Sequence, residues 1–493
     1  MTWPRRAVLG GAAALVMAGR ALARPASSGL HEALDAAARD KSPKAALDRL
    51  AGFDDARLTS FDRLDLRTAR AGLAIDAELA RRFSFGRAQG LHPYRVTPFD
   101  GAWRAATPDS AAIDEDTRAI EADARAGVML PHPWLEQTMA AIDRRGSLDE
   151  PVRAALERQR AALSALQSRS YARQGLAQVP GGRRWYELLC ARTLGEPGSL
   201  ASCEARLTAR RDALHRQAMQ AFARIGVRET SVGACFQRLW SDPAHLYPDD
   251  ESGRAQAVAD MTRHLGGIRA MLGQDFGPIP GWCLDVSVRA LSAQDVAQGR
   301  KGYREVPAPG RPGAYVVDLQ TIRLRPGWSL PAVVAHELLP GHMIQLGLEG
   351  QRPPHALRRL YAGSFVEGWG IYAEHLAERE GAYAQPLARL GYLHWQLFRV
   401  CRALVDLGIH LHGWSKAQAR ARLEAWQGVA AYFAPFDQDL DRIALDPGLR
   451  LAEGLAALAI GQRAATLSGT RLRAFHRRMV QDGSRRIDDL AAE

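Results

Sequence analysis

Cysteine is scarce in this chain of 493 residues. The five cysteines are odd in number and form no C-x-x-C pair, so neither a thiolate metal site nor a disulfide framework is indicated. We expect most of them to be buried free thiols. Disulfides between Cys190 and Cys203, or between Cys235 and Cys283, are the alternative in an oxidising compartment.

Long apolar runs are also missing beyond the N-terminus. No stretch after the first thirty residues reaches the 18 or so apolar residues that a bilayer span needs. The N-terminus has Arg5 and Arg6, then an apolar run to Gly19 and an Ala-x-Ala site at residues 21–23, a pattern typical of a signal peptide over residues 1–23. The chain is therefore predicted to be exported to the periplasm or secreted, with no stable membrane association after cleavage. The paired arginines favour the twin-arginine route over an ordinary secretory signal.

Lysine is nearly absent, and the basic surplus is dispersed. The formal net charge is +11, but only four of the 65 basic residues are lysines. The arginines alternate with Asp and Glu along helical stretches, which is typical of solvated helix faces and not of a nucleic-acid surface. We therefore expect no nucleic-acid partner.

What is abundant is helical periodicity. Ala, Leu, Arg and Glu recur at helical spacing through residues 28–280. The one clear strand pattern is residues 314–319, which are rich in β-branched and aromatic side chains. The sequence predicts a mainly α fold with a small β-sheet. An N-terminal helical region (24–300) and a C-terminal catalytic region (301–493) are expected to form one continuous folding unit.

A histidine motif lies on a helix predicted to begin near Leu330. His336 and His342 are six residues apart, which on an unbroken helix separates them by about 240° and prevents them from sharing an ion. Pro340 lacks an N–H and clashes with the carbonyl of residue 336, so the helix must kink or bulge there. With Gly341 beside it, His342 can turn back toward His336.

If His336 and His342 bind a zinc ion, a hydrolytic site also needs a third protein ligand and an open coordination position. Glu367, on a later helical stretch, is the predicted third ligand, and Glu374, on nearly the same helical face, is predicted to orient a metal-bound histidine. Glu337 is predicted to be the general base, taking a proton from a zinc-activated water. Taken singly, a His-Glu pair on a helix is usually solvent-exposed and without a functional role, and His342 could be a core histidine.

The predicted strand follows a Pro-Gly turn and precedes the motif helix. If one edge of this strand is exposed beside the site, an extended peptide could pair with it. Tyr315 and Val317 are the predicted substrate-binding residues on that hypothesis.

The motif resembles the H-E-x-x-P-G-H-x-x-Q signature of the bacterial family called domain of unknown function 885, a zincin-like group. The likeness continues through residues 365–374 and 402–414, and covers roughly residues 85 to 465. It implies a large helical zincin-like fold with zinc on His336, His342 and Glu367. It also places His410 where an imidazole could donate to an oxyanion, although a histidine ending a helix is an equal reading.

Two departures from the family pattern concern the site. Met343 stands where many relatives have a second histidine, and residues 452–461 replace a Pro-Gly-Gln segment. The prediction is a zinc metallopeptidase acting on peptide bonds. The alternatives are a metal-dependent amidase acting on a small non-peptide amide, and a periplasmic peptide-binding relative without catalysis.

Overall fold

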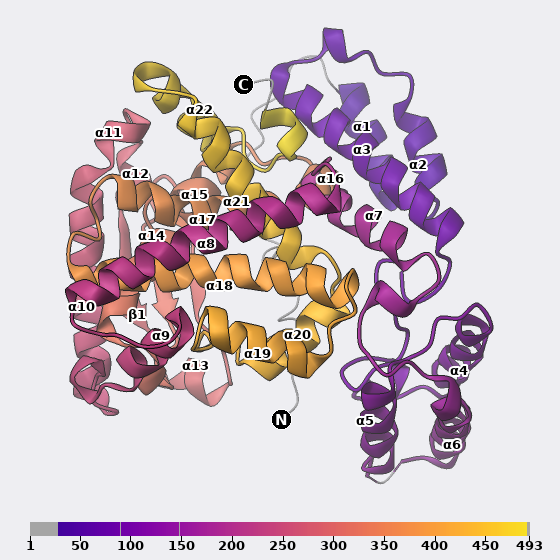
Figure 1. Cartoon of the computed structure of the whole chain (residues 1–493). Helices are drawn as coiled ribbons and strands as arrows, with labels where there is room; N and C mark the ends of the chain where they lie inside the picture. Colours follow the sequence, from indigo (N-terminus) through magenta and orange to yellow (C-terminus); the bar gives the residue numbers. More distant parts are fainter. Residues whose placement is uncertain (1–27, 89, 147, 491–493) are drawn as a thin grey trace.

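The computed structural model describes residues 28–490 except Gln89 and Ser147. The predicted signal peptide, with Arg5 and Arg6, lies outside the described residues. Helices form most of the described chain, as predicted, and a small sheet lies at one side (Figure 1). None of the described helices combines the length and apolar character needed to cross a bilayer.

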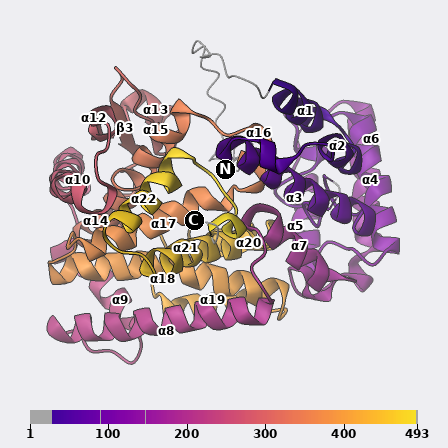
Figure 2. The ribbon, with the colours of Figure 1, turned by 90° about the horizontal axis from the view of Figure 1, so that it is seen from above.

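The first helices form an N-terminal layer with its own small core. Helices α1, α2 and α3 lie beside the later helix α16 (Figure 2). Their apolar side chains pack together and against Leu357 and Tyr361 of α16. Helices α4, α5 and α6 follow as a second group, in which α6 packs against both others. The bounds are α1 Ser28–Arg39, α2 Pro43–Leu50, α3 Ser60–Arg82, α4 Ser110–Arg125, α5 His132–Asp143 and α6 Glu150–Ala165.

A middle set of helices connects this layer to the sheet. Among them α8 is long and packs along α18, and α10 packs against both β1 and α14. The bounds are α7 Gly182–Leu194, α8 Leu200–Arg224, α9 Val232–Ser241, α10 Glu251–Met271, α11 Gly273–Phe276, α12 Gly281–Leu284 and α13 Ala293–Ala297.

The sheet has three strands in the order β1-β3-β2, with β1 (Val286–Ala290) parallel and β2 (Tyr303–Glu305) antiparallel to β3 (Gly313–Val317). The predicted strand is therefore the central one, and every residue of β3 is buried. The hypothesis that Tyr315 and Val317 offer an exposed edge to a substrate is wrong, because β1 and β2 already occupy both edges. The two partner strands are short, and the sequence analysis did not predict them.

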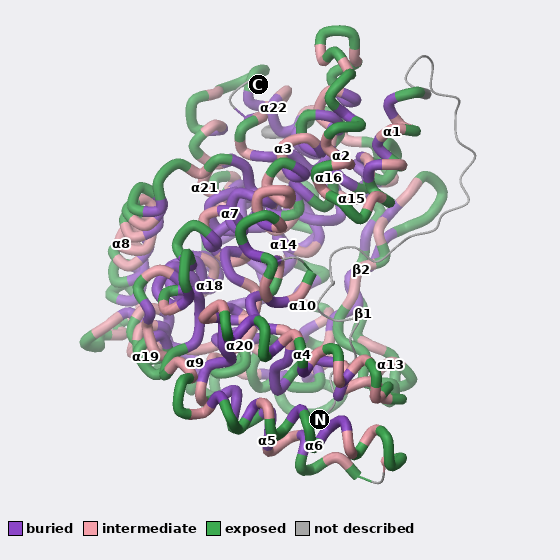
Figure 3. Tube along the Cα trace, turned by 90° about the vertical axis from the view of Figure 1, so that its right-hand side faces the viewer, coloured by how far each residue is buried: buried purple, intermediate pink, exposed green. Residues whose placement is uncertain are grey.

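The C-terminal helices pack around α18, which is buried over most of its surface (Figure 3). A helix that is buried over most of its surface needs apolar residues over most of it, and α18 has them, with buried polar residues such as Gln396, Arg402 and Asp406 among them. The bounds are α14 Leu330–Glu337, α15 His342–Gln351, α16 Ala356–Tyr361, α17 Ser364–Arg379, α18 Pro386–His410, α19 Lys416–Trp426, α20 Phe436–Leu445, α21 Leu449–Ala465 and α22 Gly469–Gln481.

The main hydrophobic core contains side chains from both sides of residue 300, from Leu79 to Leu490. All five cysteines are buried free thiols, which confirms the expectation for them. An unpaired thiol behaves as a small apolar side chain, so these cysteines pack in the protein interior as other small apolar residues do.

Candidate metal centre

The motif helix breaks where the sequence predicts. Helix α14 ends at Glu337 and α15 begins at His342, and the peptide bond between Leu339 and Pro340 is cis. Gly341 sits against the preceding turn, where a Cβ atom would lie 1.9 Å from the carbonyl oxygen of His336. Only glycine allows this approach, and the break turns His342 back toward His336.

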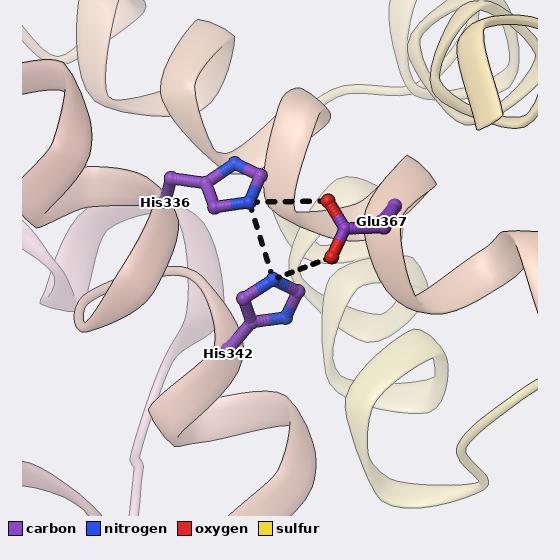
Figure 4. A group of neighbouring side chains, drawn as sticks. All are labelled: His336, His342 and Glu367. Atoms are coloured by element: carbon purple, nitrogen blue, oxygen red, sulfur yellow. Dashed lines mark hydrogen bonds and ion pairs between the residues drawn. The ribbon is translucent and has the colours of Figure 1, made fainter. Parts of the chain in front are cut away.

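Three side chains from three helices meet at this break (Figure 4). His336 Nε2 lies 3.2 Å from His342 Nε2, and the Glu367 carboxylate oxygens lie 3.4 Å from His336 Nε2 and 3.7 Å from His342 Nε2. Ligands bound to one tetrahedral zinc at about 2.0–2.2 Å lie about 3.3 Å apart. The three predicted ligands therefore already have nearly the mutual spacing that a shared zinc ion requires.

The hydrogen bonds of the two rings determine which nitrogens face this point. His336 Nδ1 lies 2.8 Å from Glu374 Oε1, and His342 Nδ1 lies 3.3 Å from Gln345 Oε1. Each Nδ1–H donates outward to an oxygen, so each Nε2 has its lone pair directed inward. Two lone pairs and a carboxylate converge, an arrangement that a proton or a metal ion between them satisfies.

The electrostatics of the cluster agree with a place for one cation. Burial and Arg399 act to lower the pKa of His336, but Glu367 and Glu374 outweigh them and raise it to about 9. Burial, with Arg304 and His336 adding to it, lowers the pKa of His342 to about 3. Burial acts to raise the pKa of Glu367, but His336 and the other nearby cations lower it well below its usual value. The residues present thus fit a zinc ion, which would take the place of the single proton.

Glu374 is held in position from its other side. Its second carboxylate oxygen accepts a hydrogen bond of 2.9 Å from Gln396 Nε2 on α18. Both residues are buried, so the carboxylate fixes the plane of the His336 ring. Spacing along the helix predicts Glu374 in this place, whereas no pattern in the sequence indicates Gln396.

Glu337 points to a different neighbour. Its Oε2 accepts a hydrogen bond from Arg304 Nε on β2, and no described group donates to Oε1. Burial acts to raise the pKa of Glu337, but Arg304, His336 and His342 outweigh it, so the pKa is lowered and the side chain is ionised at neutral pH. An ionised carboxylate with one open oxygen can accept a proton.

Two arginines that the sequence analysis missed border the centre. Arg304 belongs to the edge strand β2, and Arg399 belongs to α18. Arg399 Nη2 lies 3.4 Å from His336 Nε2, and Nη1 lies 3.7 Å from Glu367 Oε2. With 61 arginines in the chain, no local pattern distinguishes these two, because only the packing of α18 and β2 brings them here.

His410 is not among the residues brought together. It follows Arg399 by eleven residues on α18, which corresponds to about 16 Å along the helix axis. Its ring is fully buried; Nε2 lies 2.9 Å from the Ile443 carbonyl oxygen, and Nδ1 accepts a hydrogen bond from the Leu176 amide. Burial lowers the pKa of His410 to about 4. Both ring nitrogens are used by the backbone, which is a structural role and does not support donation to an oxyanion.

The segment 452–461 belongs to α21, which packs along α17. A methyl group at Gly368 would lie only 2.6 Å from the Cβ atom of Ala456, so the two helices are in close contact beside Glu367. The small residues of this segment therefore position the helix that carries Glu367.

A second group of potential ligands, His31, Asp62 and Asp65, lies between α1 and α3. Arg358 Nη1 is 3.5 Å from Asp65 Oδ1 and supplies a buried positive charge there. Asp65 is therefore already paired with a cation in this group.

The fold is similar to that of solved structures over nearly the whole chain. A structure from Colwellia psychrerythraea matches with a TM-score of 0.72 and 20% identity, covering 94% of this chain and 90% of that one. A structure from Shewanella oneidensis matches with a TM-score of 0.65 and 18% identity, covering 96% and 93%. Both of these proteins are named "putative lipoprotein". At these identities the likeness concerns the fold alone.

No curated protein matches the chain. A family model matches residues 27–493, which confirms the resemblance seen in the motif. The chain belongs to the family described as bacterial protein of unknown function (DUF885).

Proposed function

We propose that this chain is a zinc-dependent hydrolase of peptide bonds, a metallopeptidase of zincin type, with the metal held by His336, His342 and Glu367. The observation that carries the proposal is the convergence of two imidazole lone pairs and a carboxylate at 3.2–3.7 Å. A His/His/Glu set that leaves a fourth position open is the donor set of hydrolytic zinc sites. Because oxygen and nitrogen ligands of this kind also bind neighbouring metals, zinc is the first choice among several.

In the proposed reaction the metal and the side chains have separate tasks. Zinc at this site would polarise the substrate carbonyl and make a water molecule acidic. Glu337 takes a proton from water on Oε1 while Arg304 holds Oε2, and it then delivers the proton to the nitrogen of the leaving amine. Water oxygen forms the new bond to carbon as the C–N bond breaks.

Arg399 has the position to stabilise negative charge that develops on the carbonyl oxygen. Its guanidinium borders His336 and Glu367, and its Nε has no hydrogen-bond partner among the described residues. A preorganised cation at such a point stabilises the transition state more than the ground state. We propose this role for Arg399 in place of His410.

The test is metal content of the purified protein by elemental analysis, together with a screen of peptide substrates. The wild type should retain about one zinc per chain and cleave peptides, and the H336A/H342A variant should lose both properties. The E337Q variant is the matched control, because it should keep zinc and lose only cleavage. Absence of metal from the wild type even after incubation with zinc would instead favour the non-catalytic binding protein.

Export to the periplasm or the medium is a second part of the proposal. It rests on the N-terminal pattern and on the naming of the two structural relatives as lipoproteins. Cell fractionation should find the wild type outside the cytoplasm. An R5K/R6K variant should stay in the cytoplasm if the twin-arginine route is used, and normal export of that variant would assign an ordinary secretory signal.

A further inference from the structure

Arg325 is a buried arginine whose guanidinium has no hydrogen-bond acceptor within the described part of the chain. It follows the short helix η6 (Ile322–Leu324) and is only 2% exposed. None of its three nitrogens has a hydrogen-bond partner among the described residues, and its guanidinium lies over the ring of Tyr432, 3.3 Å from the ring centre. A buried guanidinium with unused donors is unfavourable unless an anion completes it.

The guanidinium lines a hollow with apolar and aromatic walls. The walls include Trp240, Trp395 and Tyr432, with Leu330 and Val333 along one side and Leu324 at the outside. In this conformation the hollow is too narrow for a water molecule. Leu324 is 46% exposed, so its side chain can rotate into solvent and open the hollow at little loss of packing.

The hollow lies beside the proposed catalytic residues. Leu330, Val333 and Glu337 are at positions i, i+3 and i+7 of α14, so they share one face of that helix. Val333 is about 6 Å and Leu330 about 10 Å from Glu337 along the axis. Tyr315 lies near both the hollow and Glu337, because residues of both affect its pKa. Burial, Tyr432 and Glu337 raise the pKa of Tyr315, and Arg325 acts to lower it.

We propose that Arg325 binds a substrate carboxylate, namely the C-terminus of the peptide, so that the enzyme removes two or three residues from that end. This inference rests on the proposed function. A peptide residue spans about 3.5 Å, so a carboxylate in the hollow about 6–10 Å from Glu337 places a bond two or three residues away next to that side chain. A guanidinium can hold a carboxylate with two parallel hydrogen bonds, and the aromatic walls suit an apolar terminal side chain.

The test compares peptides of one sequence that end in a free acid or in an amide. Wild-type kcat/KM should be about 10- to 100-fold higher for the acid, the effect of one charged hydrogen-bonded pair. R325M should remove this preference, and R323M is the matched control because Arg323 is exposed, two residues away, and should leave it unchanged. Equal cleavage of acid and amide by the wild type would overturn the inference while leaving the proposed hydrolase intact.

An amidated peptide that carries Glu at its end separates the two sources of a carboxylate. If this peptide is cleaved as fast as the free acid, Arg325 recognises an acidic side chain and the assignment to the C-terminus is wrong. Slow cleavage of the amidated peptide, with fast cleavage of the acid, supports the C-terminus.

Binding without turnover provides an independent readout. N-acetyl-phenylalanine and its amide can be titrated by calorimetry and by the fluorescence of Trp240 and Trp395, in the wild type and in R325M. The acid should bind at least about tenfold more tightly than the amide, and only when Arg325 is present. If no zinc and no cleavage are found, the proposed function fails, and this titration still decides whether the carboxylate site exists.

Folding of R325M is the last control. Because Arg325 makes no hydrogen bond, its replacement by an apolar side chain of similar length should leave the melting temperature unchanged or higher. A large fall in melting temperature, with equal loss of activity on acid and amide, would show that the residue serves the fold and would overturn the inference.

Discussion

At the scale of single residues, the candidate centre depends on the missing Cβ atom of a glycine as much as on the proposed ligands. Gly370 on α17 faces His336 across the contact between two helices. A Cβ atom there would lie 2.6 Å from Cε1 and 2.9 Å from Nε2 of the buried His336 ring. Side chains at that distance clash, and the ring has no room to withdraw.

We therefore expect G370A to displace His336 and to lower zinc affinity at least about tenfold, the range found when the groups that orient a ligand are disturbed. Competition with a chromogenic chelator measures the affinity. Gly266, on α10, has no heavy atom within 4 Å of an added Cβ, so G266A is the matched control and should retain zinc. Equal zinc affinity of the two variants would contradict this account.

The buried ring of His410 should make the stability of the protein depend on pH. Its pKa in the folded protein is lowered to about 4 by burial, compared with 6.5 when it is exposed. The neutral ring is therefore compatible with the fold above pH 6.5, and the unfolded chain binds the proton first as the pH falls. Stability from this group is present above pH 6.5 and is lost as the pH falls toward about 4.

H410Q lacks this titration, so its destabilisation relative to the wild type should be about 2 kcal/mol smaller at pH 5 than at pH 7.5. Urea denaturation at the two pH values gives the difference. H412Q, which changes a more exposed histidine two residues away, is the control for removing a histidine that the core does not enclose. A constant difference for H410Q at both pH values would be inconsistent with a neutral buried ring.

At the scale of elements, two helix contacts set the geometry of the site. The break between α14 and α15 brings the two histidines together, and the contact of α17 with α21 positions Glu367. In α21 the small side chain of Ala456 allows the close approach of Gly368. This contact supports the helix that carries Glu367, the proposed third ligand.

A456L should push α17 away from α21. We expect a loss of about 1–3 kcal/mol in unfolding free energy, as for overpacking elsewhere, together with weaker zinc binding. A457L, at the next and less buried position of α21, is the control. Thermal unfolding and zinc titration check both effects, and a destabilised A456L with normal zinc affinity would separate the helix contact from the placement of Glu367.

At the scale of the whole molecule, the three proposed ligands link parts of one large core. That core includes side chains from both sides of residue 300, so a metal ion held by α14, α15 and α17 would add to a structure that is already packed. Zinc should stabilise the native state without being required for it, unlike the small domains that unfold when zinc is removed.

Removal of zinc with a chelator should lower the melting temperature of the wild type by several degrees and leave a folded protein. Zinc in about thousandfold excess over its dissociation constant stabilises by about 4 kcal/mol. The H336A/H342A variant should not respond to the chelator. Calorimetry measures both proteins, and a response of equal size in the double variant would place the stabilising metal elsewhere.

The sequence by itself determined the local features of this protein. Helical periodicity, the Pro340-Gly341 break and the pairing of Glu374 with a ligand histidine depend on spacing along one or two helices, and spacing can be seen in the chain. The short strands β1 and β2 were missed because their three to five residues carry little pattern of their own.

Only the tertiary structure decided which distant residues reach the centre. It made β3 a central strand, placed Arg304 on Glu337 and Arg399 beside His336, and put His410 about 16 Å along α18 from Arg399. It also buried Arg325 next to α14 with no hydrogen-bond acceptor among the described residues. These outcomes depend on how elements far apart in sequence pack together, and the identity of an arginine or a histidine does not record which partner the packing will supply.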